Sequence, residues 1–348
     1  MCGFDSFLGN ERLKARLIRD IGSKHLSHAY IIEGAAGSGK RTLAKLICAA
    51  VSCRSEAPPC MECLSCDKIM RGQSPDVITV EADRDRVQLG VDVIRRLRSD
   101  AVFAANDLDN KFYIFPEADT MNPQAQNALL KLLEEPPEDI MFLLLCQNAD
   151  NLLPTIRSRA PSCRLEPLGD DMIEHWLLEN DPEAIRLHQS DPDAFRAAVK
   201  LAGGSLGRAR ELCEPKSASE ALRLWNAAER FVSLLSARGA AADELAFYEY
   251  ATKLASPKQR SELIEIYQLL ADAVRDLVAA KLTHDFRPLF YFDSETAREI
   301  SGKFPLSQLM RLSDSIAEAL DGLDRNINLG LAQTRLAMSA VSAQSKNR

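Results

Sequence analysis

The chain has 348 residues, of which 46% are hydrophobic, and a formal net charge of −7, a balance that argues against a strong sequence-independent nucleic-acid binder. Its length suits two or three domains, since one domain typically takes about 100–200 residues. Apolar runs such as Met141–Cys146 are far shorter than the roughly 20 residues of a membrane helix, so no membrane partner is expected.

The predicted elements alternate between helix and strand up to about residue 168. In chain order we expect a helix at 10–21, a strand at 29–33, a helix at 42–52, a strand at 77–80, a helix at 91–104, a strand at 111–115, a helix at 123–135, a strand at 141–147, a short helix at 154–158 and a strand at 162–166. This order predicts an α/β fold whose parallel sheet carries helices on both faces. After residue 169 only helices are expected, first a small group at 170–213 and then longer amphipathic helices at 217–343.

A glycine-rich loop follows the first expected strand. Residues 34–42 read Gly-Ala-Ala-Gly-Ser-Gly-Lys-Arg-Thr, which matches the glycine and lysine positions of the motif G-x-x-x-x-G-K-[ST]. Gly34, Gly37 and Gly39 allow backbone N–H groups to surround phosphate oxygens. Lys40 can reach the β- and γ-phosphates, and the following helix directs its positive end at the anion. The loop therefore predicts binding of ATP or ADP.

The magnesium ligands of such a site are replaced at two positions. Arg41 stands where a hydroxyl should bind Mg²⁺, and Thr42 cannot substitute because one residue along a helix turns a side chain by about 100°. The acidic pair expected after the strand at 111–115 reads Pro116-Glu117. The magnesium carboxylate is thus missing, whereas Glu117 remains where a water-activating carboxylate would lie. Two losses on the same ion predict a loop that holds phosphate without hydrolysing ATP.

Four cysteines lie between the helix after this loop and the next strand. They are Cys53, Cys60, Cys63 and Cys66. Four thiolates in so short a segment can close the tetrahedron of a structural Zn²⁺ site. Two alternatives stay open: four unliganded thiols, or an iron–sulfur cluster, for which the usual final Cys-Pro is missing. Because the first residues contain no apolar signal core, we expect a cytoplasmic protein, in which cysteines serve as thiols or metal ligands.

Four further motifs are found along the chain: Phe7-Leu8-Gly9-Asn10, His28-Ala29-Tyr30, Asn127-Ala128-Leu129-Leu130-Lys131-Leu132-Leu133-Glu134-Glu135-Pro136-Pro137 and Ile156-Arg157-Ser158-Arg159. Together with the loop and the cysteines, they resemble the bacterial clamp-loader subunits of DNA polymerase III. The resemblance covers essentially the whole chain. Within this family the gamma/tau subunits hydrolyse ATP and the delta-prime subunit generally does not. The residues at positions 41 and 116 make the chain similar to the delta-prime type.

The resemblance implies an α/β AAA+ module followed by an all-α lid and an all-α collar. Residues 1–168 are then expected to form the phosphate-loop domain with a zinc module at 53–66, residues 169–215 the lid, and residues 216–348 the collar used for oligomerisation. The implied partners are gamma/tau and delta subunits in a hetero-pentamer, with the sliding clamp and primer-template DNA reached through the complex. The chain would serve DNA replication within a DNA-directed DNA polymerase holoenzyme, a nucleotidyltransferase.

The resemblance also implies roles for arginines outside the loop. Arg159 matches the family's arginine finger, which stabilises charge on a neighbouring subunit's γ-phosphate and is worth about 10³–10⁵ in rate. A helix-end cap or a surface ion pair is the alternative for this side chain. Arg208 lies in the lid's sensor segment, one place later than in active members. Arg95, Arg96 and Arg98 form a basic run that indicates a solvated face, with contacts to the DNA backbone as the alternative.

Three functions are compatible with these residues. The first is a non-hydrolysing, delta-prime-like brace that supplies an arginine finger in trans during clamp loading. The second is an ATP-hydrolysing motor of the gamma/tau type, in which another side chain holds magnesium. The third is a zinc-containing interaction module with a vestigial phosphate loop and partners outside replication. We expect no intrinsic ATPase, and an ATPase assay with the purified chain separates the first two hypotheses.

Overall fold

The computed structural model describes residues 3–23, 25–82, 89–237, 241–254, 260–325 and 327–345. The chain divides into two compact units. The first holds Met1–Met172 together with Gly204–Arg208, and the second holds Ile173–Gly203 together with Ala209–Arg348. The first unit extends four residues beyond the predicted bound at 168 and includes one short segment from the helical part of the chain, so the predicted domain bounds stay predictions. The separation of the remaining helices into a lid and a collar stays a prediction.

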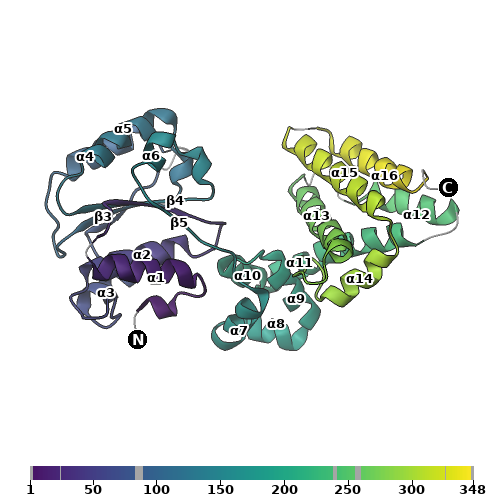
Figure 1. The fold of residues 1–348 in the computed structure, drawn as a ribbon, viewed down its shortest axis with the longest axis horizontal. Helices are drawn as coiled ribbons and strands as arrows, with labels where there is room; N and C mark the ends of the chain where they lie inside the picture. Colours follow the sequence, from purple (N-terminus) through teal and green to yellow (C-terminus); the bar gives the residue numbers. More distant parts are fainter. Residues whose placement is uncertain are drawn as a thin grey trace. The chain divides into compact units, whose positions relative to one another are not determined.

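The first unit is built on a five-stranded parallel sheet with the strand order β2-β3-β4-β1-β5 (Figure 1). The strands are β1 (Ala29–Glu33), β2 (Val77–Thr79), β3 (Lys111–Phe115), β4 (Ile140–Cys146) and β5 (Ser162–Arg164). The predicted strands are confirmed, with ends shifted by one or two residues at most. β3 and β4 are buried along their whole length, as expected for apolar strands inside a parallel sheet.

Helices cover both faces of the sheet, as predicted. One face carries α1 (Glu11–Gly22), α2 (Lys40–Ser52) and α3 (Leu64–Met70), and the other carries α4 (Val91–Asp100), α5 (Pro123–Glu134) and α6 (Pro154–Arg157) (Figure 1). Short 3-10 turns lie at η1 (Gly3–Ser6), η2 (Ala118–Thr120) and η3 (Ala149–Asn151). Successive strand residues point to opposite faces, so Ile31 packs in the core with α4 and α5, whereas Ile32 packs in the core with α2.

Two of the helices predicted in the first unit differ by more than one residue from their predicted bounds, and one helix was not predicted. α2 begins at Lys40 rather than at residue 42, because Gly39 adopts a left-handed φ of 92° and turns the chain directly into the helix. α4 ends at Asp100 rather than at residue 104, where the Lys111 amine and the Tyr113 hydroxyl both bind Asp100. α3 was not predicted at all. It forms because Cys66 and its neighbour Ile69 are buried on the core side of this short segment.

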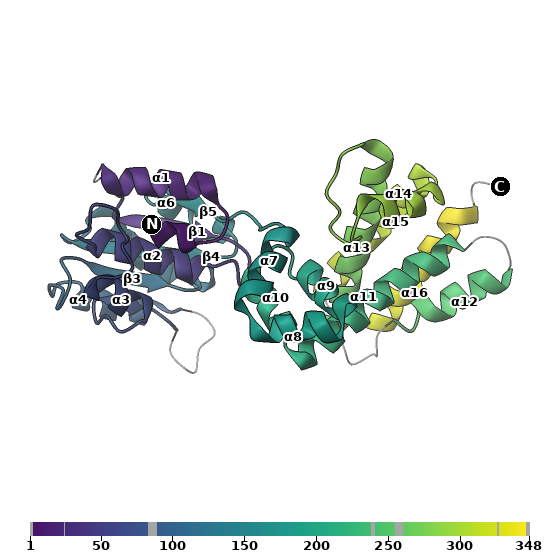
Figure 2. The same ribbon diagram turned by 90° about the horizontal axis from the view of Figure 1, so that it is seen from below.

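The described residues of the second unit form helices and connecting loops and no strand, as predicted (Figure 2). Its elements are most of α7 (Asp170–Asn180), α8 (Pro182–Ser190), α9 (Pro192–Leu201), the end of α10 (Leu206–Leu212), α11 (Pro215–Ser236), α12 (Ala241–Ala251), α13 (Arg260–Leu282), α14 (Ser294–Gly302), α15 (Leu306–Asp324) and α16 (Leu329–Ser345). Buried aromatic side chains such as Phe231 and Tyr267 fill its core. None of the helices in the described ranges has the length and apolar character needed to cross a membrane.

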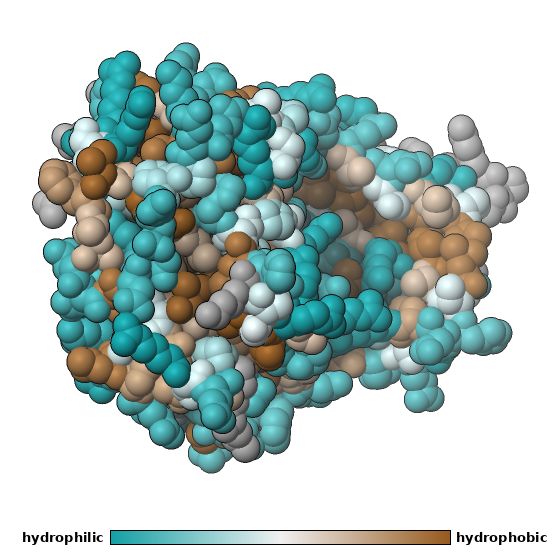
Figure 3. All heavy atoms as spheres, turned by 60° about the vertical axis from the view of Figure 1, so that its left-hand side comes forward, coloured by the Kyte–Doolittle hydropathy of each residue, from teal (hydrophilic) through white to brown (hydrophobic). Residues whose placement is uncertain are grey.

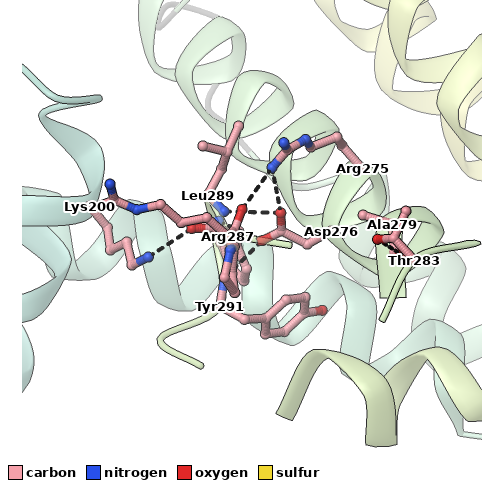
Figure 4. A network of polar contacts seen from close by, with 10 residues as sticks. Lys200, Arg275, Asp276, Ala279, Thr283, Arg287, Leu289 and Tyr291 are labelled. Carbon is pink, nitrogen blue, oxygen red and sulfur yellow. Dashed lines mark hydrogen bonds and ion pairs between the residues drawn. The ribbon is translucent and has the colours of Figure 1, made fainter. Parts of the chain in front are cut away.

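A buried carboxylate fixes the connection between α13 and α14 in this unit. Asp276 is fully buried and accepts hydrogen bonds from three successive backbone N–H groups, those of Leu289, Phe290 and Tyr291 (Figure 4). The guanidinium of Arg275 lies 3.1 Å from the same carboxylate. Phe290 is thereby held in a stacked contact with Trp225, with ring centroids 4.1 Å apart. The connection between α13 and α14 is therefore ordered by hydrogen bonds and packed against the helical core.

The surface of the first unit is largely hydrophilic on the face shown in Figure 3. Among its described residues, the most exposed large apolar side chains are Leu64 on α3 and the adjacent pair Val102 and Phe103 after α4. Scattered apolar side chains of this kind are normal on a monomer surface. The polar character agrees with the acidic composition of the chain.

Candidate functional site

The phosphate loop lies between the carboxyl end of β1 and the amino end of α2. Gly37 and Gly39 have φ angles of 71° and 92°, in the left-handed region that favours glycine. The Lys40 ammonium donates hydrogen bonds to the backbone oxygens of Gly34 (2.6 Å) and Ala35 (2.7 Å), so it folds back over the loop. Partial burial lowers the pKa of Lys40, because burial penalises the charged form. The backbone and the amine thus form a cradle suited to an anion.

A cavity of about 650 Å³ opens beside this loop. It is lined by six of the predicted residues, Gly37, Gly39, Lys40, Arg41, Thr42 and Glu117. The rest of the lining is Ala36 of the loop, Leu145 near the end of β4, and residues of the segments that follow β3 and β4, because the carboxyl ends of parallel strands meet at one edge of a sheet. Two predicted residues, Gly34 and Arg208, are not part of the lining. The sequence motifs are therefore mostly brought together around one hollow.

The magnesium ligand set expected at such a cavity is incomplete. The side chain of Arg41 is 68% exposed, and its Nη2 lies 3.8 Å from Oε1 of Glu81. Pro116 occupies the cavity wall where a metal-binding carboxylate would stand, next to Glu117. The residues present fit a phosphate group, whereas the two positions that usually hold Mg²⁺ offer a guanidinium and a pyrrolidine ring.

One carboxylate in the cavity wall was not predicted. Asp119, in the turn after β3, lines the cavity and raises the pKa of Lys40 through its negative charge, against the larger effect of burial. Its Oδ2 also accepts hydrogen bonds from the backbone N–H groups of Gln147 (2.8 Å) and Asn148 (3.4 Å). Asp119 therefore holds the end of β4 at the cavity edge. Predicting this position from the sequence would have required knowing that β3 and β4 are neighbours in the sheet.

A short segment from the helical part of the chain contacts the phosphate loop. This return segment, Gly204–Arg208, belongs to the first unit. The Ser205 hydroxyl donates a hydrogen bond to the backbone oxygen of Ala36 (2.8 Å), and the Gly207 N–H donates to that of Gly37 (3.0 Å). A Cβ on Gly207 would lie only 2.8 Å from the Gly37 oxygen. The close approach of two backbones explains why glycine stands at position 207.

Arg208 ends the return segment without lining the cavity. Its backbone N–H donates a hydrogen bond to the Ser205 hydroxyl (3.2 Å) and so closes the turn at residues 205–208. The predicted contact of its guanidinium with a nucleotide stays a prediction. Ser205 was missed by the sequence analysis, and its position between two glycines gave no sign that it would bond the loop.

Arg159 follows α6 and is held by three contacts. Its Nη2 lies 2.8 Å from Oε1 of Glu134, the last residue of α5. Its Nη1 donates hydrogen bonds to the backbone oxygen of Thr155 (3.0 Å) and to the hydroxyl of Ser158 (3.3 Å). The side chain keeps 36% of its surface exposed. Both local roles considered for Arg159, a helix-end cap and a surface ion pair, are therefore present, and neither excludes contact with a neighbouring chain.

The basic run on α4 is exposed. The guanidinium of Arg95 lies 3.6 Å from the carboxylate of Asp92, one turn earlier on the same helix, and its side chain is 74% exposed. This is the behaviour of a solvated helix face. Contacts of Arg95, Arg96 and Arg98 with a DNA backbone stay a prediction.

The four predicted metal ligands converge at the opposite end of α2. The sulfur atoms of Cys53, Cys60, Cys63 and Cys66 all lie within 4.8 Å of one another. A tetrahedral zinc–thiolate site has sulfur atoms roughly 3.8 Å apart, as follows from a zinc–sulfur distance of about 2.3 Å. The four thiols therefore fit a zinc ion with small adjustments, and these are the residues that would hold it.

The local backbone prepares the cluster for a cation. Cys53 is the residue after α2 and Cys63 is the residue before α3, so both helices direct a thiol inward. Backbone N–H groups of Glu62 and Cys63 lower the pKa of Cys60 to about 6, which favours its thiolate. Burial raises the pKa of Cys66, a penalty that a bound cation would oppose. Before a metal binds, the thiolate form is therefore favoured at Cys60 and disfavoured at Cys66.

Comparison with known proteins finds similarity to DNA polymerase III subunits. Residues 9–169 match the family described as "DNA polymerase III, delta subunit". The subunit delta' of Bacillus subtilis is 34% identical over 193 residues, which are 55% of this chain and 58% of that protein. The subunit tau of the same organism is 38% identical over 159 residues, 45% of this chain and 28% of that protein. The chain spans little more than half of the first relative and less than a third of the second.

A solved structure gives a more distant likeness. The crystal structure of a DNA polymerase III gamma-subunit-related protein from Thermotoga maritima aligns with 95% of this chain and 99% of its own length, at 19% identity and a TM-score of 0.44.

Proposed function

We propose that the chain is a non-hydrolysing, delta-prime-like subunit of the DNA polymerase III clamp loader. The match of residues 9–169 to the delta-subunit family and the similarity to delta' and tau subunits support this proposal. Such a subunit would brace a hetero-pentamer with gamma/tau and delta subunits. It would act on the sliding clamp and primer-template DNA through that complex, during DNA replication.

The observation that carries this proposal is the composition of the cavity beside the phosphate loop. The loop keeps the glycines and Lys40 that hold phosphate, while Arg41 and Pro116 replace both protein ligands of magnesium. Because Mg²⁺ bridges the β- and γ-phosphates and neutralises developing charge, its loss removes a main source of catalysis. A nucleotide bound here would serve structure rather than turnover.

The second part of the proposal is that Arg159 acts in trans. Its guanidinium lies outside the chain's own cavity lining, partly exposed and anchored on one side. An arginine presented in this way can contact the γ-phosphate held by a neighbouring subunit. The subunit would then activate its neighbour's site without having an active site of its own.

We predict that the isolated chain shows no Mg²⁺-dependent ATP turnover above background, and that Arg159→Ala lowers hydrolysis at one neighbouring site of the assembled loader by about 10³–10⁵ in rate. The assays are phosphate release by the purified chain and by a reconstituted loader with clamp and primed DNA. Turnover by the isolated chain that disappears with Lys40→Ala would refute the non-hydrolysing assignment. An unchanged rate in a fully assembled Arg159→Ala loader would leave scaffolding as the only role.

A gamma/tau-type motor is the second candidate, and the carboxylate of Asp119 at the cavity wall is the observation in its favour. Asp119 and Glu117 would have to supply magnesium ligands in place of residue 116. The turnover of the isolated chain would then depend on Asp119 and be abolished by Asp119→Asn. If the chain instead fails to co-purify with other loader subunits, the remaining hypothesis is a zinc-containing interaction module.

A further inference from the structure

The carboxylate that holds Arg159 has no assigned role, and we propose that Glu134 is a positioning residue that orients the arginine finger toward the neighbouring subunit's γ-phosphate. This inference rests on the trans role of Arg159 proposed above. The substrate class is therefore a nucleoside triphosphate bound by another subunit. Glu134 acts on it only through the guanidinium of Arg159.

The geometry of the contact carries the inference. The Glu134 carboxylate binds Nη2 of Arg159 at 2.8 Å, while Nη1 is bound by the Thr155 oxygen and the Ser158 hydroxyl. Partners on both terminal nitrogens fix the plane of the guanidinium. An arginine side chain has five N–H donors, and these three contacts leave at least two for a phosphate. The finger is thus oriented and still able to donate.

Both anchors stand on rigid elements. Glu134 is the last residue of α5, and Pro136 and Pro137 follow directly and prevent the helix from continuing. On the other side, the Arg159 N–H donates to the Ile156 oxygen (3.0 Å), which ties the backbone of the finger to α6. Because the ends of two packed helices hold the guanidinium, its position is defined better than that of a lone surface arginine.

A contribution to folding stability does not explain the presence of Glu134 at this position. A negative charge at the carboxyl end of a helix opposes the helix dipole, so Glu134 is unfavourable for α5 by itself. Its ion pair with Arg159 is exposed on both sides, at 36% and 47% of the side-chain surfaces, and exposed pairs of this kind add little to folding. The adjacent Arg157 is paired separately, with Asp150 at 2.5 Å. Glu134 therefore serves Arg159 specifically.

Glu135 provides a matched control. It is the next residue along the chain, exposed, with the same charge, and its backbone N–H caps α5 by bonding the Lys131 oxygen (3.3 Å). Removing the Glu135 side chain changes the net charge as much as removing that of Glu134. Any difference between the two variants then reports on the contact with Arg159.

The test uses the assembled loader, with the fingers of all other subunits replaced by alanine so that the measured rate reports on the site served by Arg159. Misplacing a reacting group by about 1 Å can cost about 100-fold in rate, so we expect Glu134→Ala to lower kcat by about tenfold to 100-fold with KM unchanged. Glu134→Gln should recover part of the rate, since its amide oxygen still accepts a hydrogen bond. Glu135→Ala should match the parent complex.

A double variant separates positioning from other effects. If Glu134 acts only through Arg159, Glu134→Ala should cause no further loss in an Arg159→Ala loader. Glu134→Ala at the control rate, or an additional loss in the double variant, would overturn the inference while leaving the finger in place. No effect of Arg159→Ala itself would remove the finger and this inference together. Equal melting temperatures of the single variants would show that the rate changes are not losses of folding.

Discussion

The two ends of α2 carry two sites of very different completeness. At the amino end, the phosphate loop supplies glycines and Lys40, but two magnesium positions hold Arg41 and Pro116. At the carboxyl end, Cys53 begins a cluster in which four sulfur atoms already lie within 4.8 Å of one another. The same helix thus begins at a loop whose two expected magnesium positions carry no ligand for that ion, and it ends at four converged thiols that would hold zinc.

The difference depends on whether the residues of a site lie in one short segment or in several segments that are far apart in the sequence. The cysteine cluster is made within one short stretch of chain, from a loop and the ends of two helices. The phosphate site is assembled from the carboxyl ends of several strands, so single substitutions at distant positions such as 41 and 116 change its chemistry without disturbing the loop. We therefore expect one substitution in the cysteine cluster to disrupt the whole cluster, whereas one substitution in the phosphate site changes only the function of that residue.

The largest expected effect comes from removing the metal. We predict one Zn²⁺ per chain, and Cys60→Ser or chelation should release it and unfold the segment between α2 and α3. The physical reason is that structural zinc contributes about 10–16 kcal/mol of apparent binding free energy in small modules. The measurements are metal analysis after reducing, chelator-free purification, and hydrogen exchange across residues 53–70.

Glu62→Gln is the control for this prediction. Glu62 is exposed and lies inside the same segment, but its side chain is not one of the four ligands, so the variant should keep its zinc. Less than half a zinc per parent chain would contradict the prediction and leave four free thiols or an iron–sulfur cluster, which iron analysis of the same sample distinguishes.

Much of this molecule could be predicted from its sequence, and the reasons for the failures are physical. The strands were placed correctly because short, mostly apolar runs such as Lys111–Phe115 are buried on both faces. The convergence of the four cysteines was predicted from their close spacing, and the ends of α2 and α3 place their thiols together. α3 was missed because it is stabilised by the burial of Cys66 against the core and not by a periodic pattern of its own.

The polar partners in the site were harder to predict than its motifs. Asp119 reaches the cavity only because β3 and β4 are neighbours in the sheet. Ser205 reaches the loop from 169 residues away in the chain, and Glu134 reaches Arg159 only because α5 and α6 pack together. Contacts of this kind depend on tertiary placement, and no local pattern in a single sequence announces them.

A smaller effect is expected at the loop between α4 and β3, which contacts Asp76 just before β2. Asp76 is fully buried and accepts hydrogen bonds from the backbone N–H groups of Asn106, Asp107 and Leu108. In turn, Lys68 of α3 pairs with Asp107 at 2.7 Å. We predict that Asp76→Asn lowers the free energy of unfolding by about 2–3 kcal/mol, because an amide NH₂ would face these donors. Urea denaturation at neutral pH measures the change.

The pH dependence of this variant sharpens the test. Burial raises the pKa of Asp76, but the hydrogen bonds from residues 106–108 outweigh it, so the pKa lies below its usual value of 3.8. The carboxylate then contributes stability above pH 3.8, and this contribution is lost as the pH falls through the lowered pKa. Asp76→Asn should remove that part of the acid sensitivity. Asp109→Asn, at an exposed ion pair with Arg54, should change stability by no more than about 1 kcal/mol.

The smallest expected effect is at the amino end of α2, where the return segment meets the phosphate loop. Gly207→Ala would place a Cβ 2.8 Å from the Gly37 oxygen and 2.9 Å from its Cα, and backbone atoms cannot move aside as a flexible side chain could. We therefore expect a loss of about 1–3 kcal/mol and faster hydrogen exchange at residue 207, whose N–H donates to the Gly37 oxygen at 3.0 Å. Gly22→Ala is the control, since nothing lies within 4 Å of its new Cβ. Both variants should keep their zinc, because the two ends of α2 hold separate sites. If Gly207→Ala were as stable as Gly22→Ala with unchanged exchange, the close contact between loop and return segment would not persist in solution.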